Sequence, residues 1–137
     1  MIKDMSAPEA WALLNENEDA VMLDVRTTME YEYVGHPPDA VLLPWKEAPD
    51  MQVDPEFVDK ARDVLRKARP GRDPEDLVVL TLCRSGGRSK AAGEALAENG
   101  FRNVINVVEG FEGDKDENNH RGNINGWRYH NLPWEQS

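Results

Sequence analysis

The residues best suited to chemistry lie in the run Cys83-Arg-Ser-Gly-Gly-Arg-Ser89, which holds the only cysteine among the 137 residues. The thiolate form of cysteine is a strong nucleophile, and nearby cations or a helix N-terminus favour it over the thiol. Arg84, Arg88 and Lys90 supply three positive charges close to this cysteine. We therefore predict that Cys83 is a catalytic nucleophile at neutral pH.

Two adjacent glycines, Gly86 and Gly87, follow the cysteine. Glycine permits turns that other residues resist, so consecutive backbone N–H groups in this loop can face a single point. The positive end of the helix expected after the loop adds to the attraction for an anion. A buried cysteine is often inert, but the glycines, cations and helix start together favour an anion cradle. The predicted substrate-binding residues are Arg84, Ser85, Gly86, Gly87, Arg88 and Ser89.

Patterns of buried strands alternate with amphipathic helix patterns along most of the chain. This alternation is typical of crossover units that build a parallel sheet with helices on both faces. We therefore predict an α/β fold and a single domain over residues 1–137. Cys83 follows the third expected strand, and the carboxyl ends of such strands line ligand crevices. The expected strands are 20–25, 40–43, 77–82 and 103–108, and the expected helices are 6–18, 27–34, 54–68 and one that ends at 99–100.

The chain changes character after Val108. Residues 109–126 are polar and rich in glycine, asparagine and acids, and we expect residues 112–126 to form an acidic loop at the mouth of the site. The tail from Trp127 to Trp134 is aromatic, so we expect it to dock on the core.

The composition excludes several functional classes. Acids outnumber bases by 26 to 16, and the net charge of −10 argues against a protein that coats nucleic acid or an anionic membrane. The longest apolar runs are far shorter than the roughly 18 residues of a membrane span. The N-terminus lacks the features of a secretory signal, so we expect a cytoplasmic protein. With one cysteine and three histidines that show no ligand spacing, we expect neither a disulfide, a metal site nor a cofactor.

Several segments resemble motifs of the rhodanese family of sulfurtransferases. The Cys83 loop is similar to the active-site loop of that family. The resemblance extends from about Lys3 to Trp134. Four further segments resemble its Asp-x-Arg, Gly-His-x-Pro, Gly-Gly-Phe and Gly-Trp motifs in the family's order, namely Leu23-Asp-Val-Arg26, Gly35-His-Pro37, Val108-Glu-Gly-Phe111 and Gly126-Trp127.

This resemblance implies a rhodanese domain in which Cys83 carries a sulfane sulfur as a persulfide. Cys83 would take sulfur from thiosulfate or another persulfide donor and pass it to cyanide or an acceptor thiol. Backbone N–H groups of the loop would hold the outer sulfur, and the side chains of Arg84 and Arg88 would attract the anionic donor. Asp24 and Arg26 would support the loops through internal hydrogen bonds.

The expected partners are thus a small-molecule sulfur donor and either a small-molecule acceptor or a protein that accepts sulfur. We expect no nucleic acid or membrane partner, and we expect a monomer.

Arg26 and Glu30 are also spaced for an i, i+4 ion pair. Pro38 and Asp39 stand where members of the family usually have Gly-Ala, so the local turn is expected to differ.

Two other functions stay open at this stage. A cysteine phosphatase or arsenate reductase also holds an anion after a strand, but its loop needs Cys-x5-Arg, and here the sixth residue after Cys83 is Ser89. A regulatory or redox-sensing module without enzymatic activity is the second alternative. Such a sensor would need a thiol from a partner, because this chain has no second cysteine.

Overall fold

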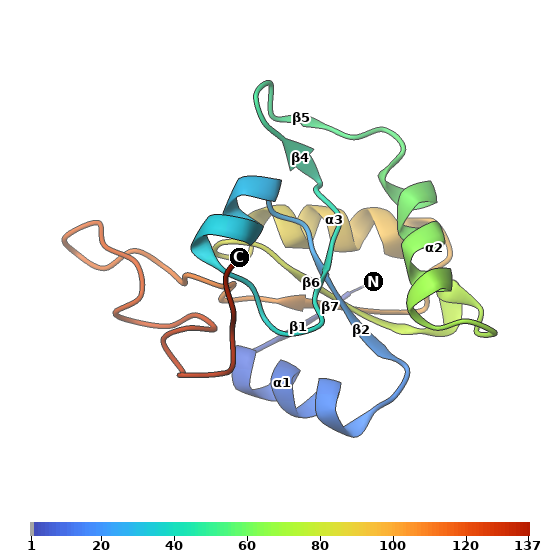
Figure 1. Ribbon diagram of the computed structural model, residues 1–137, viewed down its shortest axis with the longest axis horizontal. Coiled ribbons are helices and arrows are strands. Elements are labelled where there is room, and N and C mark those ends of the chain that lie inside the picture. The colour runs from blue at the N-terminus through green and yellow to red at the C-terminus, as the bar shows by residue number, and fades with distance from the viewer. Residues whose placement is uncertain (1) are drawn as a thin grey trace.

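A computed structural model describes residues 2–137 and shows a central sheet with helices packed against it (Figure 1). The sheet has five strands in the order β1-β7-β6-β2-β3, and every neighbouring pair is parallel. The α/β fold predicted from the alternating patterns is therefore confirmed. The strands of this sheet are β1 (Lys3–Met5), β2 (Ala20–Asp24), β3 (Val41–Leu42), β6 (Val78–Leu82) and β7 (Asn103–Val107).

The connections between these strands include α1 (Ala7–Glu16), α2 (Phe57–Ala68) and α3 (Gly87–Glu98). A short π-helix, η1 (Glu30–Val34), follows β2, and a 3-10 turn, η2 (Pro74–Asp76), precedes β6. The segment after β3 forms a small antiparallel hairpin of β4 (Lys46–Glu47) and β5 (Gln52–Val53), which projects at the top of Figure 1.

Alternate residues of the strands enter two separate hydrophobic clusters, as expected for a sheet covered on both faces. Leu23 and Val79 belong to the cluster beneath α2 and α3. Met22 and Leu80, their neighbours in sequence, belong to the cluster beneath α1. Figure 1 shows α1 on one side of the sheet and the other two helices on the opposite side.

Helix α1 begins as its sequence predicts. The hydroxyl of Ser6 accepts from the backbone N–H of Glu9, and the Glu9 carboxylate accepts from the backbone N–H of Ser6. This reciprocal pair satisfies donors that the first turn of a helix leaves unpaired.

Some element boundaries differ from the predictions. The strand expected at 40–43 is only two residues long, because Pro44 ends it and the turn at Pro38 and Asp39 delays its start. Helix α2 begins at Phe57 instead of residue 54. The helix expected at 27–34 ends in the π-helical turns of η1, and its C-cap is Gly35.

The aromatic tail docks on the core, as predicted. Trp127 is fully buried, its ring meets Trp11 of α1 edge-on with centroids 5.8 Å apart, and its Nε1 donates to the Pro133 carbonyl at 2.7 Å. The acidic loop 112–126 projects to the left in Figure 1. Among the described residues, no helix is long and apolar enough to cross a membrane.

Candidate active site

Cys83 directly follows β6, the middle strand of the sheet, and only 1% of its surface is exposed. Its carbonyl accepts from the backbone N–H of Phe111 at 2.8 Å. The backbone N–H of Gly86 donates to the Cys83 sulfur at 3.1 Å. The loop thus folds back over the sulfur, and at least one main-chain donor already points at it.

Glycine is required in this loop because two backbone segments interlock. Gly86 has a φ of +106°, and a Cβ there would lie 2.2 Å from the carbonyl oxygen of Val108. In return, Gly110 has a φ of +72°, and a Cβ there would lie 2.4 Å from the carbonyl oxygen of Arg84. A side chain at either position would force these segments apart.

The first turn of α3 supplies further main-chain donors. The first intrahelical bond of α3 runs from the N–H of Lys90 to the carbonyl of Gly86 at 3.1 Å. The N–H groups of Gly87, Arg88 and Ser89 therefore lie outside the helical ladder. Together with the positive end of this helix of twelve residues, they form a setting that favours an anion.

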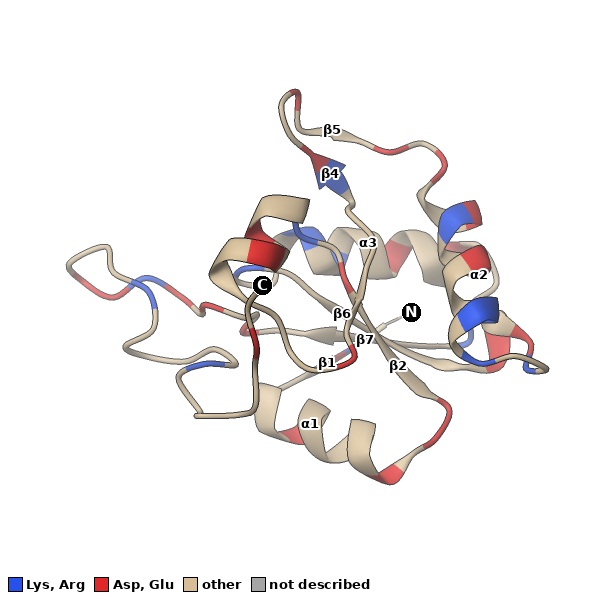
Figure 2. Ribbon diagram, viewed as in Figure 1, with Lys and Arg blue, Asp and Glu red and all other residues tan. Residues whose placement is uncertain are grey.

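Arg88 is engaged by an acid from a distant part of the chain. Its Nη1 and Nη2 donate to the two carboxylate oxygens of Glu30 at 2.7 and 3.0 Å, in a pair whose side chains are 18% and 20% exposed. Figure 2 shows the basic start of α3 beside the acidic η1. The expected pair between Arg26 and Glu30 is therefore wrong, because Arg26 is bound by Asp24 instead.

This ion pair governs the protonation of both partners. Partial burial would raise the pKa of Glu30, but the hydrogen bonds and charge of Arg88, with hydrogen bonds from Thr27, lower it to about 2. The hydrogen bonds to Glu30 and the nearby charges raise the pKa of Arg88, although its burial opposes this effect. Both groups are thus charged across the neutral range.

The remaining predicted loop residues differ in accessibility. Arg84 and Lys90 are exposed, whereas Ser85 is half-buried. The side chain of Ser89 is buried and turns into the protein, where its Oγ donates to Oδ1 of Asn106 at 2.5 Å. The Ser89 side chain therefore supports the loop from inside the protein and does not face solvent.

Asn106 of β7 is a supporting residue that the sequence reasoning missed. Its Nδ2 donates to the Gly86 carbonyl at 3.4 Å and to the Asp4 carboxylate at 3.2 Å. The hydroxyl of Thr81 donates to the Ser89 carbonyl at 2.9 Å. An asparagine between the apolar residues Ile105 and Val107 was the available signal, because a buried amide must find partners.

Asp24 and Arg26 lie at the end of β2 and are fully buried. The Arg26 Nε and Nη2 donate to the Asp24 carboxylate at 2.9 and 2.6 Å, and Nη2 also donates to the Gly35 carbonyl at 2.6 Å. The guanidinium stacks over Phe111, 4.5 Å from the ring centroid, and its Nη1 has no hydrogen-bond partner within residues 2–137. The pair joins three segments around the Cys83 loop without reaching solvent.

Glu109 occupies a position that matches a glycine in the resembled Gly-Gly-Phe motif, and the structure explains its presence. Its carboxylate accepts from the backbone N–H groups of Ala7 and Gly126 and faces Nε2 of His130, all at 2.7 Å. Although burial would raise the pKa of Glu109, these hydrogen bonds lower it. The carboxylate joins α1, the acidic loop and the tail.

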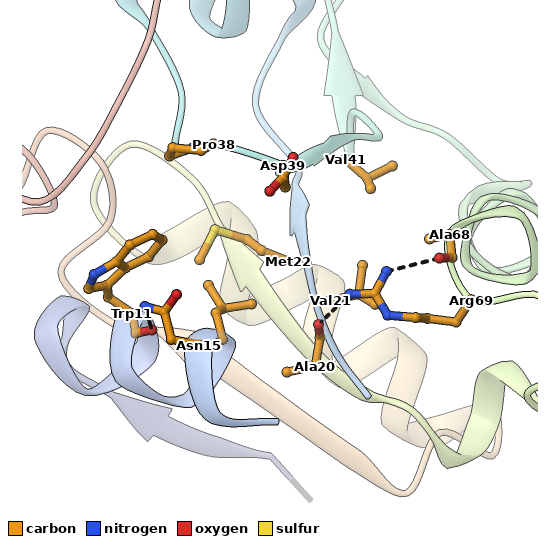
Figure 3. Close-up of a pocket in the computed structure, with 11 residues that line it drawn as sticks. Trp11, Asn15, Ala20, Val21, Met22, Pro38, Asp39, Val41, Ala68 and Arg69 are labelled. Carbon is orange, nitrogen blue, oxygen red and sulfur yellow. Dashed lines mark hydrogen bonds between the residues drawn. The ribbon is translucent and has the colours of Figure 1, made fainter. Parts of the chain in front are cut away.

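A separate pocket of about 380 Å³ opens between α1 and the edge of β2, lined by residues such as Trp11, Met22 and Val41 (Figure 3). Arg69 closes one side and donates to the carbonyls of Ala20 and Ala68. No lining residue comes from the Cys83 loop, so this pocket is not part of the candidate site. Among residues 2–137, no group of three or more His, Cys, Asp or Glu side chains is arranged to hold a metal ion.

Comparisons with known proteins place the chain among relatives of similar sequence and fold. A family model described as a rhodanese-like domain matches residues 6–117. A protein of Allochromatium vinosum named sulfurtransferase is 28% identical, over 97% of this chain and 94% of its own length. An uncharacterized protein of Rickettsia conorii is also 28% identical, over 98% of both chains. The crystal structure of Rv0390 from M. tuberculosis superposes with a TM-score of 0.82 and 36% identity, over 98% of both chains.

Proposed function

The chain belongs to the family of rhodanese-like domains, and we propose on that basis that it is a sulfurtransferase that works through a persulfide on Cys83. The relative named sulfurtransferase supports this class of reaction. The donor that we propose is thiosulfate or a persulfide, and the acceptor is cyanide or a thiol, which a protein can supply.

In the first half-reaction, the Cys83 thiolate attacks the outer sulfur of the donor. With thiosulfate, a new sulfur–sulfur bond forms to Cys83, the bond to the sulfonate group breaks, and sulfite leaves with the electron pair. With a persulfide donor, the leaving group is the donor's thiolate. The outer sulfur on Cys83 then carries the negative charge.

In the second half-reaction, cyanide or an acceptor thiolate attacks that outer sulfur. The products are thiocyanate or a persulfide on the acceptor, and the electron pair of the broken bond returns to Cys83 as the thiolate. Covalent catalysis of this kind divides one transfer into two displacements, so the kinetics are expected to be ping-pong.

One contact carries the proposal, namely the hydrogen bond from the Gly86 N–H to the Cys83 sulfur. It brings the main chain of the loop against the sulfur, and the N–H groups of Gly87 and Arg88 follow at the positive end of α3. Such donors stabilise an anionic sulfur just beyond Cys83. The exposed Arg84 and Lys90 are the side chains that we propose to attract an anionic donor.

The test is the mass of the intact protein after incubation with thiosulfate. We expect one additional sulfur atom on Cys83 and its removal by cyanide or a small thiol. Cys83→Ser should give neither the adduct nor turnover. A sequential rate pattern, or turnover by Cys83→Ser, would refute the mechanism.

A regulatory module is separated from an enzyme by the same samples. An enzyme forms the adduct and returns to the unmodified mass through many cycles with thiosulfate and cyanide in excess. A redox sensor would instead gain oxygen from peroxide on Cys83 and show no repeated turnover.

A further inference from the structure

We infer that Glu30 is a positioning residue that determines specificity, because it holds the guanidinium of Arg88 away from tetrahedral oxyanions. The inference rests on the proposed function, since it concerns which donors the same loop accepts. It assigns the site to persulfide donors in preference to donors that carry an oxyanion group, such as the sulfonate of thiosulfate.

The geometry of the pair is the first basis for this inference. A guanidinium recognises a carboxylate, phosphate or sulfonate through two parallel hydrogen bonds. On Arg88, the end-on edge formed by Nη1 and Nη2 is used by Glu30, at 2.7 and 3.0 Å. To bind at this edge, an oxyanion would have to displace the Glu30 carboxylate, which is also negatively charged, from a partly buried ion pair with Arg88.

Glu30 is itself fixed, so it does not yield Arg88 easily. The backbone N–H and the hydroxyl of Thr27 donate to its Oε1 at 3.1 and 3.0 Å, and the Thr27 hydroxyl accepts from the Glu30 N–H at 3.3 Å. This reciprocal capping holds the acid at the start of η1. The carboxylate therefore has partners for both oxygens before any substrate arrives.

The ion pair with Glu30 also determines which positive charges of the loop can attract an anion. With Arg88 neutralised by Glu30, the free cations of the loop are Arg84 and Lys90, and both are exposed to solvent. Exposed charges bind anions weakly and are screened by salt. A persulfide depends less on such charges, because its negative charge lies on the one sulfur atom that the main-chain donors hold.

The experiment measures how inorganic phosphate and sulfate protect Cys83 from alkylation by iodoacetamide, which requires no sulfur transfer. In Glu30→Gln, the side chain presents one acceptor oxygen in place of two, so the pair of parallel bonds is lost and an N–H group of the Arg88 guanidinium becomes available. We expect about a tenfold lower protecting concentration of phosphate, as a charge-assisted hydrogen bond permits. The ratio of kcat/KM for thiosulfate to that for glutathione persulfide should rise in the same variant.

Glu47→Gln is the matched control. The Glu47 carboxylate accepts from the backbone N–H and the hydroxyl of Thr28, the residue after Thr27. This change therefore removes a negative charge close to Glu30 without altering a contact of Arg88. We expect unchanged protection in Glu47→Gln, and loss of the gain in the double variant Glu30→Gln/Arg88→Ala. Equal shifts in both single glutamine variants would overturn the inference, because they would show a general charge effect.

Glu30→Asp decides the question if the glutamine variant does not fold. It keeps the net charge but withdraws one carboxylate oxygen from the guanidinium, so we expect a smaller gain in the same direction. Wild-type protection in Glu30→Asp would then overturn the inference. Failure of the wild-type protein to form a sulfur adduct would instead contradict the proposed function. The alkylation assay would still test the role of Glu30, because it requires no sulfur transfer.

Discussion

The α-carbon of Gly86 faces the carbonyl of Val108 so closely that any Cβ at Gly86 would lie 2.2 Å from that oxygen. At Gly87, the next residue, a Cβ would meet no atom within 4 Å apart from its chain neighbours and the backbone of its own helix. These adjacent glycines therefore provide a matched pair of substitutions. We expect Gly86→Ala to lose at least about 2 kcal/mol of stability and most of the reactivity of Cys83, through strain and displacement of the donor N–H.

Gly87→Ala, at the first position of α3, should keep its activity and unfold no more easily than the wild type. Thermal unfolding and the rate of sulfur-adduct formation measure both variants. Equal behaviour of the two alanine variants would contradict the close contact with Val108.

The two arginines of the loop should separate function from stability. Arg84→Ala removes an exposed charge, so we expect a severalfold higher KM for thiosulfate and a change in stability within about 0.5 kcal/mol. Arg88→Ala leaves the Glu30 carboxylate without its partner, and we expect a loss of about 1–3 kcal/mol. Denaturant unfolding and thiosulfate kinetics at two salt concentrations measure these effects. Unchanged kinetics in Arg84→Ala would contradict its proposed role, and Lys90 would then be the side chain that attracts the donor.

The low pKa of Glu30 makes part of the stability dependent on pH. Because its folded pKa of about 2 lies below its ordinary value of 4.5, the ionised form is favoured in the folded state. Its contribution is fully present above pH 4.5 and is lost as the pH falls toward 2. At neutral pH, the free energy of unfolding of the wild type should be larger than that of Glu30→Gln by on the order of 1 kcal/mol. This value allows for the screening of a partly exposed ion pair by solvent.

Denaturant unfolding at a series of pH values tests this dependence. The difference between the two proteins should shrink between pH 4.5 and 2. A difference that stays constant across this range would show that the carboxylate charge contributes nothing.

Glu109 should be intolerant of the isosteric amide. Its two oxygens accept from the N–H groups of Ala7 and Gly126, so either orientation of Gln would place an amide N–H against a backbone donor. We expect Glu109→Gln to lose about 1–3 kcal/mol and to loosen the aromatic tail. Tryptophan fluorescence, to which the buried Trp127 contributes, and chemical unfolding provide the readout. Glu117→Gln, at an exposed position, is the control and should match the wild type.

The fold was predictable where burial dominates the sequence pattern. The apolar runs that became β2, β6 and β7 are buried nearly throughout, so their composition reveals them. Strand β1 was missed because it is an edge strand with exposed Lys3 and Asp4, which carry no apolar signal. The short β4–β5 hairpin was missed for the same reason, since its residues are exposed or half-buried.

The candidate site was predictable to the extent that it is local in sequence. Cys83 and its glycines form one continuous loop, and their order already indicates a turn before a helix. The partner of Arg88 was not predictable, because 58 residues separate it from Glu30. Local spacing favoured Arg26 as the partner of Glu30, but Arg26 is held by Asp24 in a pair that only the bend after β2 creates.

Cys83 is carried by a strand with a partner on each side, whereas β1 and β3 end the sheet with three and two residues. Local opening of a native protein begins at such weakly held margins and reaches the central strands last. The amide hydrogens of Leu80 and Leu82 should thus exchange with deuterium only when the whole molecule unfolds. On warming, the edge strands should open first while Cys83 stays in position. The proposed activity should therefore persist up to the cooperative melting transition and be lost with it.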